Sequence, residues 1–114
     1  MRILIVEDNR QMREMIKSII ADIADHVDEC GEGEQALALY ERGRPDWVLM
    51  DLKIKEADGI QVTRQIKSAF PDAKIVVVTN YDDADLKQAA RLAGACEYVN
   101  KRDLLSVRRI LLRS

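Results

Sequence analysis

Three short stretches of the chain are apolar at every position rather than at every second position. They are Ile3–Val6, Trp47–Met50 and Ile75–Val78. Because a strand that is buried on both faces needs apolar side chains on both, such runs are typical of parallel sheets covered by helices. Two weaker runs, at residues 26–30 and 95–99, complete a set of five predicted strands.

The amphipathic segments between these runs predict five helices. Residues 12–23 carry apolar side chains at three- and four-residue spacing, which gives one wide apolar stripe. Pro71 and Gly94 are the expected ends of the third and fourth helices, and Asp103 is the expected N-cap of the last. The predicted helices cover residues 12–23, 34–41, 59–70, 82–93 and 103–112.

The alternation of strands and helices predicts the fold class. It favours an α/β fold, a doubly wound parallel sheet of five strands with helices on both faces. The chain has 114 residues, which is enough to bury a core, and no linker or low-complexity stretch interrupts it. We therefore expect residues 1–114 to form a single domain.

Composition and charge narrow the function. The formal net charge is −2 and the sequence pI is about 5.4, which argues against direct nucleic-acid binding by this domain. No apolar run approaches the roughly 18 residues that span a membrane, so a cytoplasmic domain without membrane contact is expected. Cys30 and Cys96 are expected to be buried free thiols, and His26, the only histidine, is expected to lie away from any site.

Polar side chains follow four of the predicted strands. Glu7 and Asp8 come after the first, Asp51 after the third, Thr79 after the fourth, and Lys101 shortly after the fifth. Each has an ordinary explanation when taken alone, such as a turn, a helix cap or a surface lysine. In an open α/β sheet, however, ligands bind beyond the carboxyl ends of the strands, so the five together indicate a site.

The chemistry of these residues points to phosphoryl transfer. Three neighbouring carboxylates repel one another and stay ionised only beside a cation, and an all-oxygen set of ligands suits a hard ion such as Mg²⁺. A carboxylate attacks phosphoryl groups to form an acyl phosphate. Mg²⁺ and Lys101 would then neutralise the phosphoryl oxygens from two sides, and Thr79 would donate a hydrogen bond.

The order and spacing of these motifs resemble the receiver domain of bacterial response regulators, the CheY-like family. The resemblance covers nearly the whole chain, and its pieces are residues 3–9, residues 47–52 followed by Asp58-Gly59, residues 76–79, and Gly94-Ala95 leading to Tyr98 and Lys101. Each piece is common by itself, whereas the set is specific. The resemblance implies a flavodoxin-like strand order of 2-1-3-4-5 and a single receiver domain over residues 1–114.

The resemblance also implies a role for each residue at the acidic site. Asp51 would accept a phosphoryl group from the phosphohistidine of a sensor histidine kinase or a histidine phosphotransfer protein. Asp8, Asp51 and the backbone carbonyl of Lys53 would bind Mg²⁺, with Glu7 holding the ion through water. By the same resemblance the chain would be a signalling switch, which catalyses only its own phosphorylation and dephosphorylation.

The remaining implied roles concern the readout of phosphorylation. Thr79 and Lys101 would contact the phosphoryl group, and Tyr98 would turn inward as Thr79 moves. The output surface would be residues 82–112, which run from the fourth helix to the fifth helix of the family. The last predicted helix has apolar residues beyond a single stripe, so this surface is expected either to complete the core or to form a homodimer or effector contact.

Four positions depart from the family or crowd the site. Arg102 stands where the family usually has a proline, often after a cis bond. The absence of this proline is a weak hint of a helix-turn-helix DNA-binding output. Asn80 stands where a small residue is usual. Lys53 and Tyr81 are bulky, so we expect them, together with Asn80, to slow hydrolysis of the acyl phosphate.

Two other functions compete with a phosphorylated switch. One is an interaction-only pseudo-receiver, which keeps the fold but is not phosphorylated; Asn80 and Arg102 leave it open. The other is an enzyme or electron carrier of similar topology. The acidic first loop disfavours flavin phosphate, no glycine-rich phosphate loop follows the first strand, and the paired aspartates and cap of a haloacid-dehalogenase-type phosphatase are missing.

Overall fold

The computed structural model describes residues 1–54 and 57–113, and five parallel strands form its central sheet. Their order is β2-β1-β3-β6-β7, which is the predicted 2-1-3-4-5 once the strands of this sheet are numbered along the chain. The predicted doubly wound α/β fold is therefore confirmed. The strands are β1 (Arg2–Val6), β2 (His26–Cys30), β3 (Trp47–Met50), β6 (Ile75–Thr79) and β7 (Glu97–Asn100).

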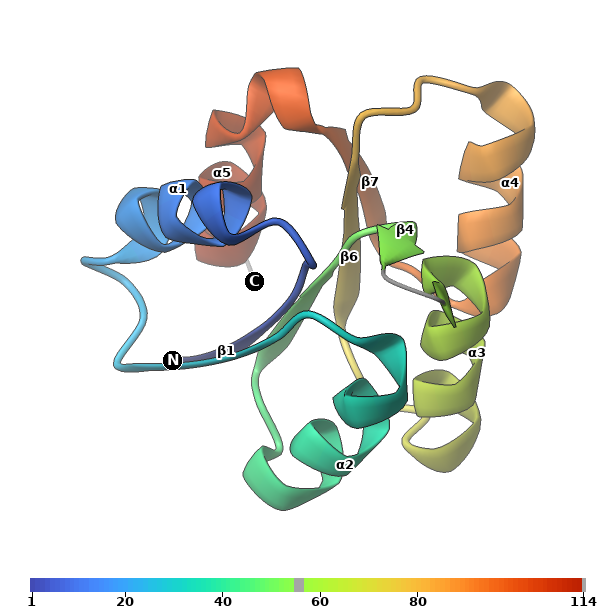
Figure 1. The fold of residues 1–114 in the computed structure, drawn as a ribbon, viewed down its shortest axis with the longest axis horizontal. Helices are drawn as coiled ribbons and strands as arrows, with labels where there is room; N and C mark the ends of the chain where they lie inside the picture. Colours follow the sequence, from blue (N-terminus) through green and yellow to red (C-terminus); the bar gives the residue numbers. More distant parts are fainter. Residues whose placement is uncertain (55–56, 114) are drawn as a thin grey trace.

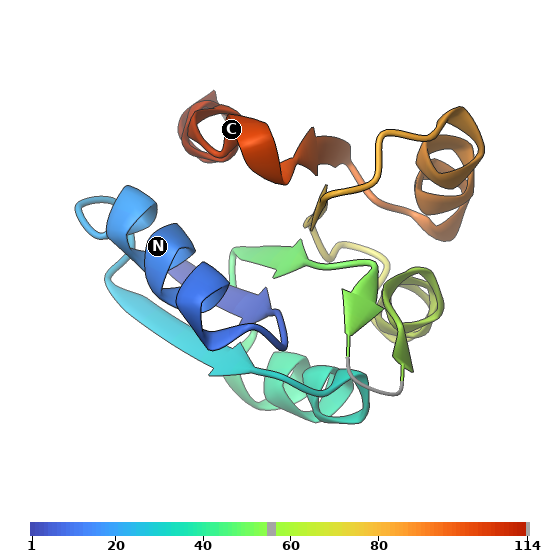
Figure 2. The ribbon, with the colours of Figure 1, turned by 45° about the horizontal axis from the view of Figure 1, so that its top comes forward.

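Helices cover both faces of this sheet. Figure 1 shows α1 and α5 together on one side, with α2, α3 and α4 on the other, and Figure 2 shows the same two groups from a second direction. The helices are α1 (Arg10–Ile20), α2 (Gly33–Gly43), α3 (Gly59–Ala69), α4 (Ala84–Ala93) and α5 (Leu105–Arg113). No helix in the described part of the chain is both long and apolar enough to cross a membrane.

The two layers of helices explain the continuous apolar runs. Successive side chains of a strand point to opposite faces of the sheet. Accordingly, Ile3 and Ile5 pack in the core beneath α1 and α5, whereas Leu4 and Val6 pack in the core beneath α2 and α3. A third buried cluster joins the sheet to α3 and α4. The central strands β1, β3 and β6 are therefore apolar on both faces.

Side-chain and glycine caps set the helix ends. The Asn9 side chain accepts a hydrogen bond from the backbone of α1, and Asp58 and Asp83 cap α3 and α4 in the same way. Gly94 ends α4 with a φ of 112°, a conformation that glycine adopts without a Cβ clash. The predicted end of α4 at Gly94 is therefore confirmed.

Some predicted boundaries are wrong. The first helix ends at Ile20 rather than at residue 23, α4 begins two residues later than predicted, and β7 is shifted by about two residues from the predicted range. Asp103 is not the N-cap of α5, because it lies inside the short 3-10 helix η1 (Lys101–Asp103), whose own N-cap is Asn100. The tighter 3-10 turn delays the start of α5 to Leu105.

Of the predictions for the two cysteines and the histidine, only the burial of Cys96 is wrong. Cys30 is buried as expected, but Cys96 is exposed where the chain enters β7. Both are free thiols. His26 is the first residue of β2, whereas Glu7 and Asp51 follow the other ends of β1 and β3, so His26 lies away from them as expected. Its ring contacts Asp28.

A short hairpin that was not predicted connects β3 to α3. Its strands are β4 (Lys53–Ile54) and β5 (Ala57–Asp58), which pair antiparallel. Two residues a strand are too few to produce a periodic sequence signal. The hairpin matters for the site because it follows Asp51 almost directly and carries Lys53.

Candidate functional site

The register of the central strands brings Glu7 and Asp51 together. Val6, the last residue of β1, pairs with Met50, the last residue of β3, so the next residue of each strand leaves the sheet at the same level. The Asp51 amide donates to the Val6 carbonyl at 3.0 Å, which carries the parallel pairing one residue beyond the strand. Two acids that are far apart in sequence therefore become neighbours.

The same edge receives Thr79 and Lys101. Thr79 is the last residue of β6 and pairs with Asn100, the last residue of β7, and Lys101 follows Asn100 directly. Thr79 is fully buried. The residues that the sequence placed after four strands thus all lie at the carboxyl edge of the sheet.

Three of the predicted side chains form a compact acidic cluster. Glu7, Asp8 and Asp51 each offer one carboxylate oxygen, and these oxygens lie within 4.8 Å of one another. Glu7 and Asp51 are only 2% and 6% exposed, whereas Asp8 is open to solvent. An all-oxygen set with one open side fits a hard divalent cation such as Mg²⁺, which keeps water among its ligands.

Lys101 supplies the positive charge that this cluster contacts. Its Nζ lies 2.7 Å from Glu7 Oε1 and 3.2 Å from Asp51 Oδ2, and its side chain is only 9% exposed. Burial by itself would lower the pKa of Lys101, but the hydrogen bond with Glu7 and the charge of Asp51 outweigh burial and raise it. Lys101 is therefore a charged bridge between the two buried acids.

Burial raises the pKa of both acids, the opposite of its effect on Lys101. It raises the pKa of Glu7, against the lowering effect of hydrogen bonds from Lys101 and from the Asn9 amide. Burial also raises the pKa of Asp51, although Lys101 and the backbone amides of Lys53 and Leu52 favour its ionised form. Keeping both acids ionised consequently costs free energy that a nearby cation offsets.

Gly59, which the sequence offered only as part of a motif, sets the position of the Asp51 backbone. A Cβ at Gly59 would lie 2.0 Å from the Asp51 carbonyl oxygen and 2.8 Å from the Leu52 Cα, both of them backbone atoms. The Gly59 amide also donates to the Leu52 carbonyl at 2.8 Å. The start of α3 therefore presses directly on the segment that carries Asp51.

Tyr81 links Thr79 to Tyr98 through its backbone. The Tyr81 amide donates to Thr79 Oγ1 at 3.4 Å, and the Tyr98 hydroxyl donates to the Tyr81 carbonyl at 2.6 Å. The two residues expected to act as a switch are thus connected by one intervening peptide segment. Arg102, the other departure near this edge, follows Lys101 through a trans peptide bond.

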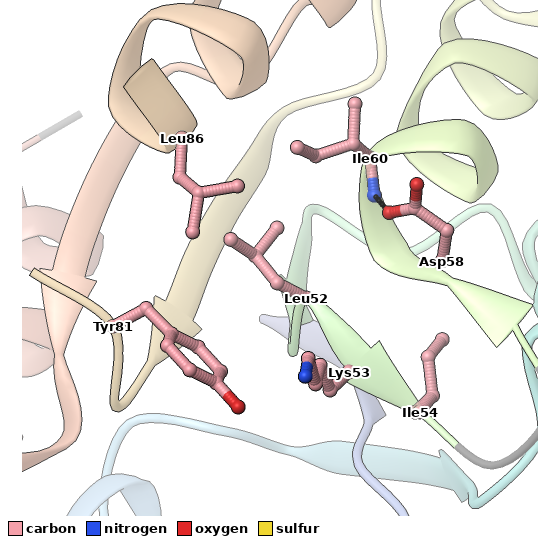
Figure 3. Close-up of a pocket in the computed structure, with 7 residues that line it drawn as sticks. All are labelled: Leu52, Lys53, Ile54, Asp58, Ile60, Tyr81 and Leu86. Atoms are coloured by element: carbon pink, nitrogen blue, oxygen red, sulfur yellow. Dashed lines mark hydrogen bonds between the residues drawn. The ribbon is translucent and has the colours of Figure 1, made fainter. Parts of the chain in front are cut away.

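The bulky residues expected beside the site lie together. Lys53 Nζ is 5.1 Å from the centre of the Tyr81 ring, and Figure 3 shows the lysine side chain next to that ring. Asn80 precedes Tyr81 and is exposed. Lys53 and Tyr81 also border a largely apolar pocket of about 450 Å³, which is completed by Leu52, Ile54, Asp58, Ile60 and Leu86.

Comparison with known proteins gives a consistent family. Residues 3–109 match the response regulator receiver domain. The response regulator MprA of Mycobacterium leprae is 35% identical over 99% of this chain and 51% of its own length. The uncharacterized transcriptional regulatory protein YhcZ of Bacillus subtilis is 38% identical over 86% of this chain and 47% of its own.

A solved structure extends the comparison to the fold. The BeF3-activated N-terminal receiver domain of Klebsiella pneumoniae RstA is 26% identical, with a TM-score of 0.86 over all of both chains. The chain spans about half the length of the curated relatives that it matches. The similarity to those two relatives therefore concerns one part of each.

The contact at Gly59 predicts a large loss of stability when a methyl group is added. In Gly59→Ala the new Cβ meets backbone atoms that cannot rotate away, so we expect the free energy of unfolding to fall by about 3 kcal/mol, the upper end of the usual cost of overpacking. Urea denaturation followed by circular dichroism measures this change.

Gly43→Ala is the matched control for this substitution. A Cβ at Gly43 lies 3.2 Å from Asp28 Oδ2 and 3.3 Å from Arg2 Nη2, which are the ends of side chains that can move. Because alanine favours a helix over glycine by roughly 1 kcal/mol, Gly43→Ala should be neutral or stabilising. Equal stabilities for the two variants would contradict a special close approach at Gly59.

Proposed function

Since this chain belongs to the response regulator receiver domains, we propose that it accepts a phosphoryl group on Asp51 and signals through the surface formed by residues 82–112. Phosphorylation is typical of the family, whose receiver domains are signalling switches rather than classical enzymes. The observation that carries the proposal is the Lys101 bridge between Glu7 and Asp51, beside a cluster of carboxylates that suits a divalent cation.

The proposed reaction moves one phosphoryl group. An Asp51 carboxylate oxygen attacks phosphorus, the phosphorus–nitrogen bond of a phosphohistidine breaks, and its electron pair stays on the ring nitrogen. A proton taken up by the ring leaves neutral histidine, and Asp51 becomes an acyl phosphate. The Lys101 ammonium group, already 3.2 Å from Asp51 Oδ2, would shift to form an ion pair with a phosphoryl oxygen. The Thr79 hydroxyl would donate a hydrogen bond to the phosphoryl group.

The proposed metal ligands are Asp8, Asp51 and the backbone carbonyl of Lys53. A bound Mg²⁺ would supply positive charge to the phosphoryl oxygens in addition to the charge of Lys101. Glu7 already engages Lys101 through Oε1, so contact through a water molecule fits it better than direct coordination. Asp8, the exposed member of the cluster, faces the solvent from which the ion would enter.

The proposed readout runs from Thr79 through Tyr81 to Tyr98. A Thr79 hydroxyl that turns toward the phosphoryl group would loosen its contact with the Tyr81 amide. The Tyr81 carbonyl holds the Tyr98 hydroxyl, so movement of this segment would change how the tyrosine packs. Tyr98 lies in β7 and therefore inside the proposed output surface.

We also propose the setting in which the switch works. Residues 1–114 would form one cytoplasmic receiver domain, with a sensor histidine kinase or a histidine phosphotransfer protein as phosphodonor. One relative is a transcriptional regulatory protein about twice as long as the matched segment, which supports a DNA-binding effector region in the whole protein. Nucleic acid would contact that region, because this domain carries a net charge of −2.

One prediction of the proposed function concerns phosphorylation itself. Incubation with acetyl phosphate and Mg²⁺ should give a base-labile adduct in the wild-type protein, detected by intact-mass spectrometry, and no adduct in Asp51→Asn. Lys101→Met should keep the fold but form the adduct at least about a hundredfold more slowly, the usual cost of losing a charged group that stabilises a transition state.

The controls separate the switch from a pseudo-receiver. A wild-type protein that forms no adduct would reject the proposal and favour an interaction-only domain. An adduct that persists in Asp51→Asn would reject Asp51 as the phosphoacceptor. Sedimentation of the same phosphorylated sample tests the homodimer proposed for residues 82–112, where Leu105 and Leu112 are 69% and 57% exposed. A monomer with and without the phosphoryl group would exclude self-association.

Another prediction of the proposed function concerns the lifetime of the acyl phosphate. We propose that Lys53, Asn80 and Tyr81 slow its hydrolysis, because the paired Lys53 and Tyr81 side chains line a pocket together with Leu52, the residue that follows Asp51, and would hinder an attacking water. Lys53→Ala combined with Tyr81→Ala should shorten the half-life about tenfold, measured by loss of the adduct after removal of the donor. Asn80→Ala should shorten it less, and a half-life that is unchanged or longer in the double variant would refute this role.

A further inference from the structure

Arg13 of α1 contacts the acidic loop from behind the carboxylates. Its Nη1 donates to the main-chain carbonyl of Glu7 at 2.8 Å, while the Glu7 amide donates to the Cys30 carbonyl at 3.0 Å. The second bond belongs to the pairing of β1 with β2, and the first lies beyond it. The peptide between Glu7 and Asp8 is thus oriented by a side chain rather than by the sheet.

The arginine is itself held in place. Its Nε donates to Glu29 Oε1 at 2.8 Å, and the other oxygen of Glu29 lies 2.7 Å from Lys17 Nζ. The hydrogen bond from Lys17 is the largest influence on Glu29 and lowers its pKa, so Glu29 is a firmly ionised anchor. Because a guanidinium is planar, fixing its Nε also fixes the direction of Nη1.

The space around the arginine is narrow. A Cβ on Gly31 would lie 3.4 Å from Arg13 Nη1 and 3.5 Å from the Asp8 Cα. The guanidinium therefore passes between the loop after β2 and the loop that carries Asp8. Its side chain is only 20% exposed.

We propose that Arg13 is a positioning residue for the divalent-cation site. By holding the Glu7 carbonyl it orients the next peptide, and so the direction in which the Asp8 side chain projects from the backbone. The inference rests on the metal site proposed above and adds a residue that does not touch the cation. Groups that orient metal ligands through hydrogen bonds contribute strongly to metal affinity, although they lie outside the coordination sphere.

Positioning and charge have opposite signs at this residue, which makes the role testable. A guanidinium repels a divalent cation, so if charge dominated, removing Arg13 would tighten cation binding. If positioning dominates, removing Arg13 releases the Glu7–Asp8 peptide and weakens binding. Lys17 offers a control for charge, because its described contacts are with Glu14 and Glu29 and not with the acidic loop. Arg13 also lowers the pKa of Glu29, so the Arg13–Glu29 pair should remain when Lys17 is removed.

Equilibrium binding of Mn²⁺, followed by electron paramagnetic resonance without any phosphodonor, gives the readout. We expect Arg13→Met to raise the dissociation constant about tenfold, the lower end of the range for such ligand-orienting groups. Arg13→Lys should also weaken binding, since one ammonium cannot reproduce the planar fork between Glu7 and Glu29. Lys17→Met, which removes a neighbouring positive charge of the same size, should stay within about twofold of wild type.

Amide hydrogen exchange in the metal-free proteins provides a second readout. The Asn9 amide donates to Glu7 Oε2 at 3.0 Å, so a loop released from Arg13 should show faster exchange at Asn9 in both Arg13 variants but not in Lys17→Met. Thermal unfolding in EDTA establishes that each variant is folded. If Arg13→Met is unfolded, Mn²⁺ binding by Arg13→Lys tests the positioning role instead.

Each remaining outcome overturns a stated part of the argument. Unchanged or tighter Mn²⁺ binding in Arg13→Met, wild-type binding in Arg13→Lys, or equal weakening in Lys17→Met would each reject positioning by Arg13 while leaving the metal site intact. A wild-type protein that does not bind Mn²⁺ would overturn the proposed metal site itself, and the role of Arg13 with it.

Discussion

The amino group of Lys101, held between Glu7 and Asp51, is the interaction on which the rest of the site depends. Burial raises the pKa of both acids, so their ionised forms need a compensating charge. One lysine provides a single positive charge for a cluster that also contains Asp8. The negative charge left over would attract a divalent cation, and the charge of that cation would offset the repulsion that a phosphoryl group meets at Asp51.

Such a concentration of charge requires a backbone that cannot relax away from it. The parallel register ends β1 and β3 at the same level, and α3 presses on the Asp51 carbonyl through a residue that has no side chain. Arg13 restrains the other acidic segment from the side of α1. Repulsion among the carboxylates is therefore opposed by the strand register, by the close packing at Gly59 and by the hydrogen bond from Arg13.

The sequence predicts those features that follow from a periodic pattern or from the topology of parallel strands. Continuous apolar runs require cover on both faces, and the ends of parallel strands converge at one edge. The predicted positions of Glu7, Asp51 and Thr79 at that edge are therefore confirmed. Features decided by a single contact leave no such pattern. The two-residue strands of the hairpin, the 3-10 turn that contains Asp103 and the Arg13 contact with a main-chain carbonyl are of this kind.

Tyr81 has two roles in the proposed switch, and the structure keeps them on different parts of the residue. Its ring lies against Lys53 beside the pocket, where it would affect the entry of water. Its amide and carbonyl contact Thr79 and Tyr98, where they would pass on the movement that follows phosphorylation. Because any residue other than proline supplies the same backbone groups, the proposed lifetime role of the side chain at this position could change without altering the proposed path by which the signal is read.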